Sequence, residues 1–329
     1  MNGAKSMTSK KISCGVLGAL ALSVVLISGS GASATAANSP GLSSAGVTTW
    51  IVPQTQQGGD YWTAQRMTAA TPGDALVVNR SLAAVKAAQS QPVTAGKSVS
   101  VPSQSAAKKA IPTATQESTV SHIGKVFFTL GGTDYVCSGN AIAAANRSTV
   151  ATAGHCVNQG PGAFATRWVF VPAYQNGTAP YGQWTATALT APTQWTSGGD
   201  INYDTGFARV APVNGAFLSN IVGASGASFN QARGLTYKAF GYPAGPPFTG
   251  ATLQSCSGTA QADPYGQSQS QGIPCDMTGG SSGGPWFIGS SSGGSQNSVN
   301  SFGYTSVPNT MFGPYWGSVI QSTYSSAAA

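Results

Sequence analysis

Residues 276–286 read DMTGGSSGGPW, a stretch in which two glycines on each side enclose a pair of serines. Glycine lets the backbone turn sharply, so its N–H groups can point at one place. A serine held in such a turn has what a nucleophile requires, an exposed Oγ beside amides that can stabilise an oxyanion. The stretch therefore predicts a nucleophilic serine, with the amides of Gly280 and Ser282 aimed at one point as its oxyanion hole.

A candidate general base and a candidate acid precede this serine in the sequence. The chain has two histidines, and His155 follows the strand-like run 148–153. His122 precedes the first predicted strand and is expected to be exposed or to lie at the junction with the propeptide. Asp204 leads into the apolar strand 206–210, where it could accept the imidazole N–H and hold its tautomer. We expect His155 as the general base and Asp204 as its acid, with Asp200 as the weaker alternative because it follows a glycine-rich loop.

The composition favours a β-rich protein. Charged residues make up 7% of the chain, and 43 of 329 residues are glycine, which excludes coiled coils and helix bundles. The 41% hydrophobic content is sufficient for a core. Short β-branched and aromatic runs follow residue 120, and polar clusters separate them: 125–130, 148–153, 167–171, 184–189, 206–210, 236–240, 286–288 and 298–304. They predict antiparallel strands in a sandwich or barrel, with the polar patches 267–271 and 290–298 as surface loops.

The net charge of +7 is concentrated near the N-terminus. Residues 1–37 carry +3, residues 38–118 carry +3, and residues 119–329 carry only +1. The region with strand patterns therefore has no basic run for phosphates, and nucleic acid is excluded as a predicted partner.

The first residues have the pattern of a secretory signal peptide. Three lysines precede the apolar stretch 12–27, and small residues with A-x-A sites follow it at 28–37. The apolar stretch is too short for a confident membrane span. We expect cleavage near residue 36, export to the extracellular space, and no stable membrane anchor.

Export to an oxidising compartment favours disulfides for the cysteines. Cys14 would leave with the signal peptide, and four cysteines remain, which allow three pairings. The shortest loops favour Cys137–Cys156 and Cys256–Cys275. Metal ligation is the alternative, but no Cys-x-x-Cys or histidine pair accompanies these residues, so no metal site is predicted.

Residues 37–118 differ from the rest of the chain. They are rich in small and polar residues, lack cysteine, and have one helical pattern at 74–88 followed by prolines at ten-residue spacing. We predict a poorly ordered propeptide or linker here, followed by the folded region 119–329.

The three motifs, in the order His, Asp, Ser, resemble the chymotrypsin-type serine peptidases. The stretch TAGHC (152–156), the acid before an apolar strand, and GSSGGP (280–285) carry this resemblance over residues 119–329. The secreted bacterial branch that includes the V8-type glutamyl endopeptidases is the more similar one. The resemblance implies two six-stranded antiparallel β-barrels, at 119–215 and 216–329. It also implies that His155 is the general base, Asp204 its orienting acid and Ser282 the nucleophile. Cys137 and Gly139 resemble the half-cystine and glycine before the family's histidine, which supports the Cys137–Cys156 bridge.

Substrate recognition is less well defined by the sequence. Ser301 and Gly303 resemble the family's contacts to substrate backbone, and this neighbourhood lacks the histidine of glutamate-specific relatives. Asp276 lies six residues before Ser282, where trypsin-like enzymes bind Arg or Lys, or it is a structural acid beside Cys275. Ser281 replaces the family's usual acid before the nucleophile, so any activation of a zymogen must proceed differently.

The prediction is a secreted, monomeric serine endopeptidase that hydrolyses peptide bonds in protein substrates through an acyl-enzyme, without a cofactor. Its activity should fall below about pH 6–7, since a histidine base has an ordinary pKa of ~6.5. A catalytically inactive peptidase-fold binding protein is the alternative. The Gly-x-Ser-x-Gly pattern of esterases fails, because Pro285 prevents a following helix and no histidine follows Ser282.

Overall fold

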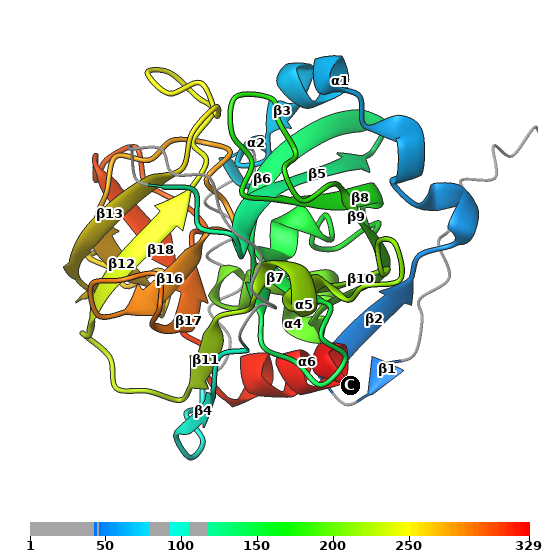
Figure 1. Ribbon diagram of the computed structural model, residues 1–329. Helices are drawn as coiled ribbons and strands as arrows, with labels where there is room; N and C mark the ends of the chain where they lie inside the picture. The colour runs from blue at the N-terminus through cyan, green and yellow to red at the C-terminus, as the bar shows by residue number, and fades with distance from the viewer. Residues whose placement is uncertain (1–42, 45, 79–92, 105–117) are drawn as a thin grey trace, which may run out of the picture. The chain divides into compact units, whose positions relative to one another are not determined.

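Antiparallel sheets dominate the computed structural model, which describes residues 43–44, 46–78, 93–104 and 118–329 (Figure 1). The predicted signal peptide lies outside these residues. So does most of the helix predicted at 74–88, of which only α2 (Ala75–Val78) is described.

The first half of residues 119–329 contains a closed barrel. Its strands are hydrogen-bonded in the order β9-β10-β7-β6-β5-β8, and pairing of β8 with β9 closes the ring. The bounds are β5 (Ile123–Leu130), β6 (Thr133–Ile142), β7 (Thr149–Thr152), β8 (Thr166–Pro172), β9 (Trp184–Pro192) and β10 (Gly206–Val210). A two-glycine turn, Gly131 and Gly132 with φ of 59° and 83°, joins β5 to β6 and suits their right-handed twist. This barrel confirms the all-β prediction.

Part of the segment predicted as propeptide or linker pairs with this barrel. Strand β2 (Val47–Ile51) extends the sheet along β9, β1 (Ser43–Ser44) pairs with β2, and β3 (Thr71–Pro72) pairs with β6 in parallel. Trp50 of β2 is buried and stacks on Phe164 at 5.9 Å between ring centroids. The structure thus differs from a poorly ordered linker here because apolar side chains of the segment complete the core.

The second half consists of two sheets. One has the order β13-β12-β16-β17-β11-β4 and the other β14-β15-β18, and the disulfide between Cys256 and Cys275 connects them. The bounds are β4 (Val99–Val101), β11 (Gly226–Phe229), β12 (Thr236–Gly241), β13 (Gln254–Thr259), β14 (Gln261–Ala262), β15 (Gln271–Pro274), β16 (Pro285–Ile288), β17 (Ser295–Val299) and β18 (Thr310–Gly313). Strand β4, from the N-terminal segment, pairs with β11.

Helices are few and short. They are α1 (Ala64–Ala69), α2, α4 (Thr193–Gly198), α5 (Leu218–Val222) and α6 (Ser318–Ala328), with 3-10 turns η1 (Gln54–Gln56), η2 (Gly59–Tyr61), η3 (Gly154–Cys156) and η4 (Ile201–Tyr203). Helix α6 lies beside β2, β9 and β10 (Figure 1). It buries Ile320, Tyr324 and Ala327, one face at helical spacing, against the first barrel.

The patch 290–298 is not entirely a surface loop as predicted. Its last part forms β17, and the polar side chains there are buried because each one has a partner. The side-chain oxygen of Gln296 accepts from the side-chain amide of Asn140 at 2.7 Å. The side-chain oxygen of Asn297 accepts from the Tyr237 hydroxyl at 2.7 Å. Buried polar side chains that are hydrogen-bonded are compatible with a core.

Candidate active site

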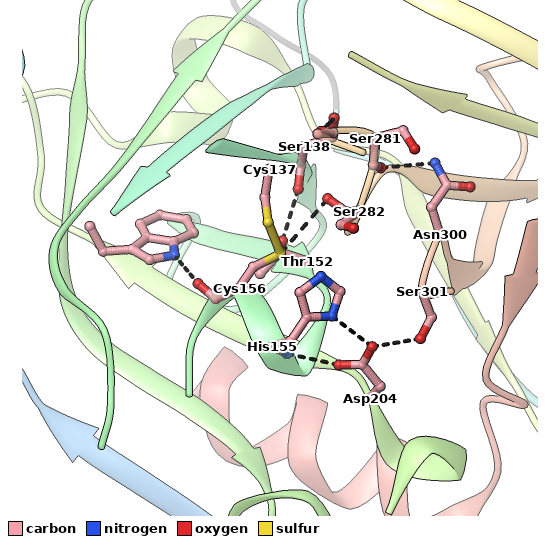
Figure 2. Close-up of a disulfide and its surroundings, with 12 residues drawn as sticks. Cys137, Ser138, Thr152, His155, Cys156, Asp204, Ser281, Ser282, Asn300 and Ser301 are labelled. Carbon is pink, nitrogen blue, oxygen red and sulfur yellow. Dashed lines mark hydrogen bonds and ion pairs between the residues drawn. A yellow bond between two sulfur atoms is a disulfide. The ribbon is translucent and has the colours of Figure 1, made fainter. Parts of the chain in front are cut away.

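His155 and Asp204 are joined by two hydrogen bonds in the first barrel (Figure 2). The imidazole Nδ1 lies 2.8 Å from Asp204 Oδ2, and the backbone N–H of His155 donates to Oδ1 at 2.7 Å. His155 is in η3, directly after β7, while Asp204 directly follows η4 and precedes β10, which pairs with β7. Both side chains are fully buried, so the carboxylate fixes the ring with little competition from water.

Ser301 adds a third contact to this pair. Its hydroxyl donates to Asp204 Oδ2 at 2.5 Å. Burial alone would raise the pKa of Asp204, but the neighbouring His155 and the hydrogen bonds from His155 and Ser301 outweigh it, so this pKa lies below its usual value. The sequence suggested Ser301 as a substrate contact, and its bond to the acid went unpredicted because no local signal links residues 97 positions apart.

Ser282 reaches the same place from the second half. Figure 2 shows it beside the imidazole edge that carries Nε2, on the side away from Asp204. Nε2 is buried and has no hydrogen-bond partner among the described residues. No hydrogen bond within them joins it to the Ser282 hydroxyl.

The glycines around Ser282 are required by close packing. Gly283 has φ of 81°, and a Cβ there would lie 2.1 Å from Thr152 Oγ1. A Cβ on Gly284 would lie 1.9 Å from the carbonyl oxygen of Phe240. The backbone N–H of Ser138, next to the half-cystine Cys137, donates to the carbonyl of Ser282 at 2.7 Å. The loop is therefore held by backbone contacts to both halves of the fold.

The turn before Ser282 presents free amides. Gly280 has φ of 93°, and its carbonyl oxygen accepts from the Ser138 hydroxyl at 2.9 Å. The preceding carbonyl, of Gly279, accepts from the N–H of Ala244 at 2.6 Å. Within the described chain, no hydrogen bond uses the N–H of Gly280 or of Ser282, so both amides remain available to an incoming oxygen.

Both predicted disulfides are present. Cys137 pairs with Cys156 beside His155, and Cys256 pairs with Cys275. Cys137, His155 and Cys156 form the only cluster of three potential metal ligands that the described residues contain. The two sulfurs are bonded to each other, so this cluster has no thiolates to offer a metal.

The remaining predicted residues lie elsewhere or have other contacts. Asp276 is exposed and follows the disulfide at Cys275. Asp200, the alternative acid, accepts from the N–H and side-chain amide of Asn202 instead of from His155. Gly303 lies near Thr310, whose carbonyl oxygen would be 3.3 Å from a Cβ at residue 303.

His122 is half-buried, which differs from the exposed position that was one of its two expected alternatives. Its Nδ1 lies 2.7 Å from the side-chain oxygen of Asn140, and its ring meets Phe287 edge-on. Burial lowers the pKa of His122, against a smaller opposite effect of the bond to Asn140.

Comparison with known proteins connects this geometry to a family. No protein family model matches the chain. The crystal structure of protease Anisep from Arthrobacter nicotinovorans is 67% identical, with a TM-score of 0.63 over 64% of this chain and 97% of that one. The thermostable serine protease AL20 from an extremophilic microorganism is 52% identical, with a TM-score of 0.62 over the same shares.

A glutamyl endopeptidase of Bacillus licheniformis is 35% identical over 148 residues, which are 44% of this chain and 43% of that protein. The alignment thus spans less than half of this curated relative. In contrast, this chain covers 97% of each of the two solved proteases, and its sequence identity to each is above 50%. On this basis the chain belongs to the chymotrypsin-like serine endopeptidases, in the branch related to the V8-type enzymes.

Proposed function

We propose that this chain is an exported serine endopeptidase in which Ser282 is the nucleophile, His155 the general base and Asp204 its orienting acid. The observation that carries the proposal is the buried bond between His155 Nδ1 and Asp204 Oδ2, 2.8 Å long. It leaves Nε2 of the same ring, which has no partner among the described residues, on the side of Ser282 (Figure 2).

In the proposed reaction, Ser282 Oγ attacks the carbonyl carbon of a peptide bond while His155 Nε2 takes the hydroxyl proton. The amides of Gly280 and Ser282 donate to the oxygen that becomes negative. His155 then gives the proton to the leaving amine, which produces an acyl-enzyme. Water, activated by His155 in the same way, hydrolyses the ester and regenerates Ser282. Asp204 stays ionised throughout, which its lowered pKa favours.

Export is supported by the signal-like pattern at 1–36 and by the two disulfides, which are typical of oxidising compartments. Among the described residues, none of the helices has the length and apolar character to cross a membrane. Protein or peptide substrates and a monomeric enzyme complete the proposal.

Cleavage of a fluorogenic peptide library by the secreted protein, compared with Ser282→Ala, tests this function. Loss of the nucleophile leaves only ~10³–10⁴-fold catalysis over water, so the variant should be silent in this assay. Equal cleavage by both proteins would overturn the assignment of Ser282, and no cleavage by either, after residues 38–118 have been trimmed, would favour the inactive binding protein.

The same library addresses Asp276. Cleavage after Arg or Lys that Asp276→Ala abolishes would support its role in binding basic side chains. An unchanged preference in Asp276→Ala would return this exposed acid to a structural role.

A further inference from the structure

Ser138 lies on β6 of the first barrel and contacts the loop of the nucleophile from there (Figure 2). Its backbone N–H donates to the carbonyl of Ser282, and its own carbonyl accepts from the Thr152 hydroxyl at 2.8 Å. The residue is fully buried. Its hydroxyl is therefore held in one place without competition from water, and the proposed reaction gives this hydroxyl no role.

The Ser138 hydroxyl makes two hydrogen bonds, and both lead to the second half of the fold. It donates to the carbonyl of Gly280 at 2.9 Å and accepts from the backbone N–H of Tyr242 at 2.8 Å. Tyr242 directly follows β12, whereas Gly280 lies in the turn before Ser282. A serine hydroxyl has one proton to donate, and Gly280 takes it. One hydroxyl thus connects two separate segments of the second half to β6.

The two peptide planes on either side of Gly280 both depend on these segments. The plane after Gly280 carries the carbonyl that Ser138 holds. The plane before it carries the N–H proposed for the oxyanion, and the carbonyl of this plane, from Gly279, accepts from the N–H of Ala244 at 2.6 Å. Ala244 follows two residues after Tyr242, whose N–H is bonded to the Ser138 hydroxyl. Ser138 therefore holds one plane directly and the other through the segment that begins at Tyr242.

Holding both planes matters at Gly280 because glycine rotates easily. Its φ of 93° is one of several conformations open to a residue without a Cβ. A peptide bond is planar, so a fixed carbonyl also fixes the N–H on the opposite side of the same plane. Rotation of the plane before Gly280 would turn its N–H away, and a donor stabilises the developing charge best when it is already in place.

We propose that Ser138 is a positioning residue whose hydroxyl keeps the Gly280 amide directed at the oxyanion. It acts through Gly280 and Tyr242 and not on the reacting atoms. The oxyanion hole belongs to the second half, yet it is complete only when β6 of the first barrel is packed against it. The inference rests on the proposed function, because an oxyanion forms only when a nucleophile attacks a carbonyl.

Steady-state kinetics of the active secreted protein, compared with Ser138→Ala, test this role. Loss of a whole oxyanion donor lowers kcat by about 10²–10³-fold. Because the Gly280 amide remains but is held less firmly, we expect kcat to fall about 30-fold in Ser138→Ala while KM changes by less than about twofold. Such a split indicates a contribution made in the transition state, whereas damage to substrate binding raises KM.

Ser148→Ala is the matched control. Ser148 is a buried serine directly before β7 of the first barrel, and its hydroxyl also accepts from a backbone N–H, that of Leu218 at 3.4 Å. We expect this variant to keep the kcat and KM of wild type. An equal fall of kcat in Ser148→Ala and Ser138→Ala would trace the loss to general loosening of the barrel and would overturn the proposal.

Ser138→Thr and Ser138→Val separate the hydroxyl from packing. The two new side chains have the same shape, but only threonine has a hydroxyl. We expect Ser138→Thr to have a kcat close to that of wild type and Ser138→Val to lose as much as Ser138→Ala. This pair also tests the role if Ser138→Ala fails to fold, which thermal unfolding of each variant reveals. Equal kcat in the threonine and valine variants would contradict a role of the hydroxyl.

A peptide aldehyde made from the best-cleaved library peptide reports on the oxyanion itself. Ser282 Oγ forms a bond to the aldehyde carbon, the hydroxyl proton passes to His155, and the carbonyl oxygen becomes the anion that the amides bind. We expect its inhibition constant to rise about 30-fold in Ser138→Ala, in parallel with the fall of kcat. The peptide alcohol of the same sequence has no carbonyl to attack at this position and should bind both proteins equally. An unchanged constant for the aldehyde, or an equal rise for the alcohol, would count against Ser138.

The outcomes separate this inference from the proposed function. If wild type cleaves and Ser282→Ala is silent, equal kinetics of wild type and Ser138→Ala would remove only the role of Ser138. If wild type cleaves no faster than Ser282→Ala and binds the aldehyde no better than the alcohol, the proposed function fails, and the role of Ser138 fails with it.

Discussion

The two halves of the candidate site are held in different ways. His155 and Asp204, in the first barrel, are oriented by side-chain hydrogen bonds in a fully buried environment. Ser282, in the second half, is placed by backbone hydrogen bonds and by glycines that no other residue could replace without a clash. The comparison teaches that the histidine half depends on charge, whereas the serine half depends on backbone conformation. Substitutions should therefore reduce activity in the first half and stability in the second.

Asp204→Asn should have the largest effect on the histidine half. An amide can present the wrong hydrogen-bonding group to Nδ1, and we expect kcat to fall by about 10⁴-fold, as in triads of this kind. Steady-state kinetics on a cleaved library peptide measures the loss. Asp200→Asn is the matched control, because Asp200 is also a buried acid but bonds to Asn202. A comparable loss in Asp200→Asn would contradict the assignment of the acid.

Gly283→Ala should have the largest effect on the serine half. The new Cβ would lie 2.1 Å from Thr152 Oγ1 on a backbone with φ of 81°. We expect the free energy of unfolding to fall by about 3 kcal/mol, from strain and overpacking together. Gly215→Ala shares a positive φ, 75°, but has open space around its Cβ, so it should lose only about 1 kcal/mol. Denaturant unfolding measures both, and equal losses would show that packing around Gly283 is unimportant.

Lys125 connects the halves and gives a pH-dependent test. Its buried ammonium, on β5 of the first barrel, donates to the carbonyl of Gly250 at 3.0 Å. The N–H of Gly250 in turn donates to the carbonyl of Pro243. The next residue, Ala244, donates its N–H to the carbonyl of Gly279, in the turn before Ser282. Burial lowers the pKa of Lys125 from 10.5 to about 8. Between these values the unfolded chain holds a proton that the folded chain has lost, so this group makes stability rise with pH.

We expect the free energy of unfolding of wild type, relative to that of Lys125→Met, to increase by about 1–3 kcal/mol as the pH rises from 8 to 10.5. Lys97→Met, at an exposed lysine, should stay parallel to wild type. Chemical denaturation across this pH range measures the difference. A constant gap between wild type and Lys125→Met would show that Lys125 titrates alike in both states.

Ser301→Ala should have the smallest effect. It removes one donor to Asp204 from the second half but leaves both bonds to His155, so kcat should fall only about tenfold. Ser298→Ala is the control, since that buried hydroxyl donates to the carbonyl of Pro314 instead. Parallel loss of kcat in both variants would show that the loss does not arise from the bond to Asp204. A loss in Ser301→Ala as large as in Asp204→Asn would mean that the second half contributes to the charge arrangement as much as the first.

The sequence was sufficient for strands that carry their own apolar pattern. The runs at 125–130, 167–171 and 206–210 correspond to β5, β8 and β10. Strand β17 was predicted only in part, because Gln296 and Asn297 look like loop residues until their partners at 140 and 237 are known. Such partners lie 60 or more positions away, and periodicity within one strand cannot identify them.

In the candidate site too, local sequence patterns could be predicted and contacts between distant segments could not. Residue types and their order predicted His155, Asp204 and Ser282, which the fold brings to one place (Figure 2). The contact of Ser301 with Asp204 and the place of Asp74 beside Gly279 depend on distant segments meeting, so the sequence pattern gave no signal for them. Composition likewise predicted a linker where β2 pairs, because one five-residue strand is a small part of a polar segment.

The position of β2 has a consequence for self-association. Ala188–Thr190 of β9 pair with β10 on one side and with β2 on the other. A chain from which the N-terminal segment has been removed would present the N–H and C=O groups of this stretch as an open sheet edge, and open edges invite pairing with other chains. It would also uncover the ring face of Phe164 that Trp50 stacks on. The segment therefore protects the newly made protein from edge-to-edge aggregation for as long as it stays attached.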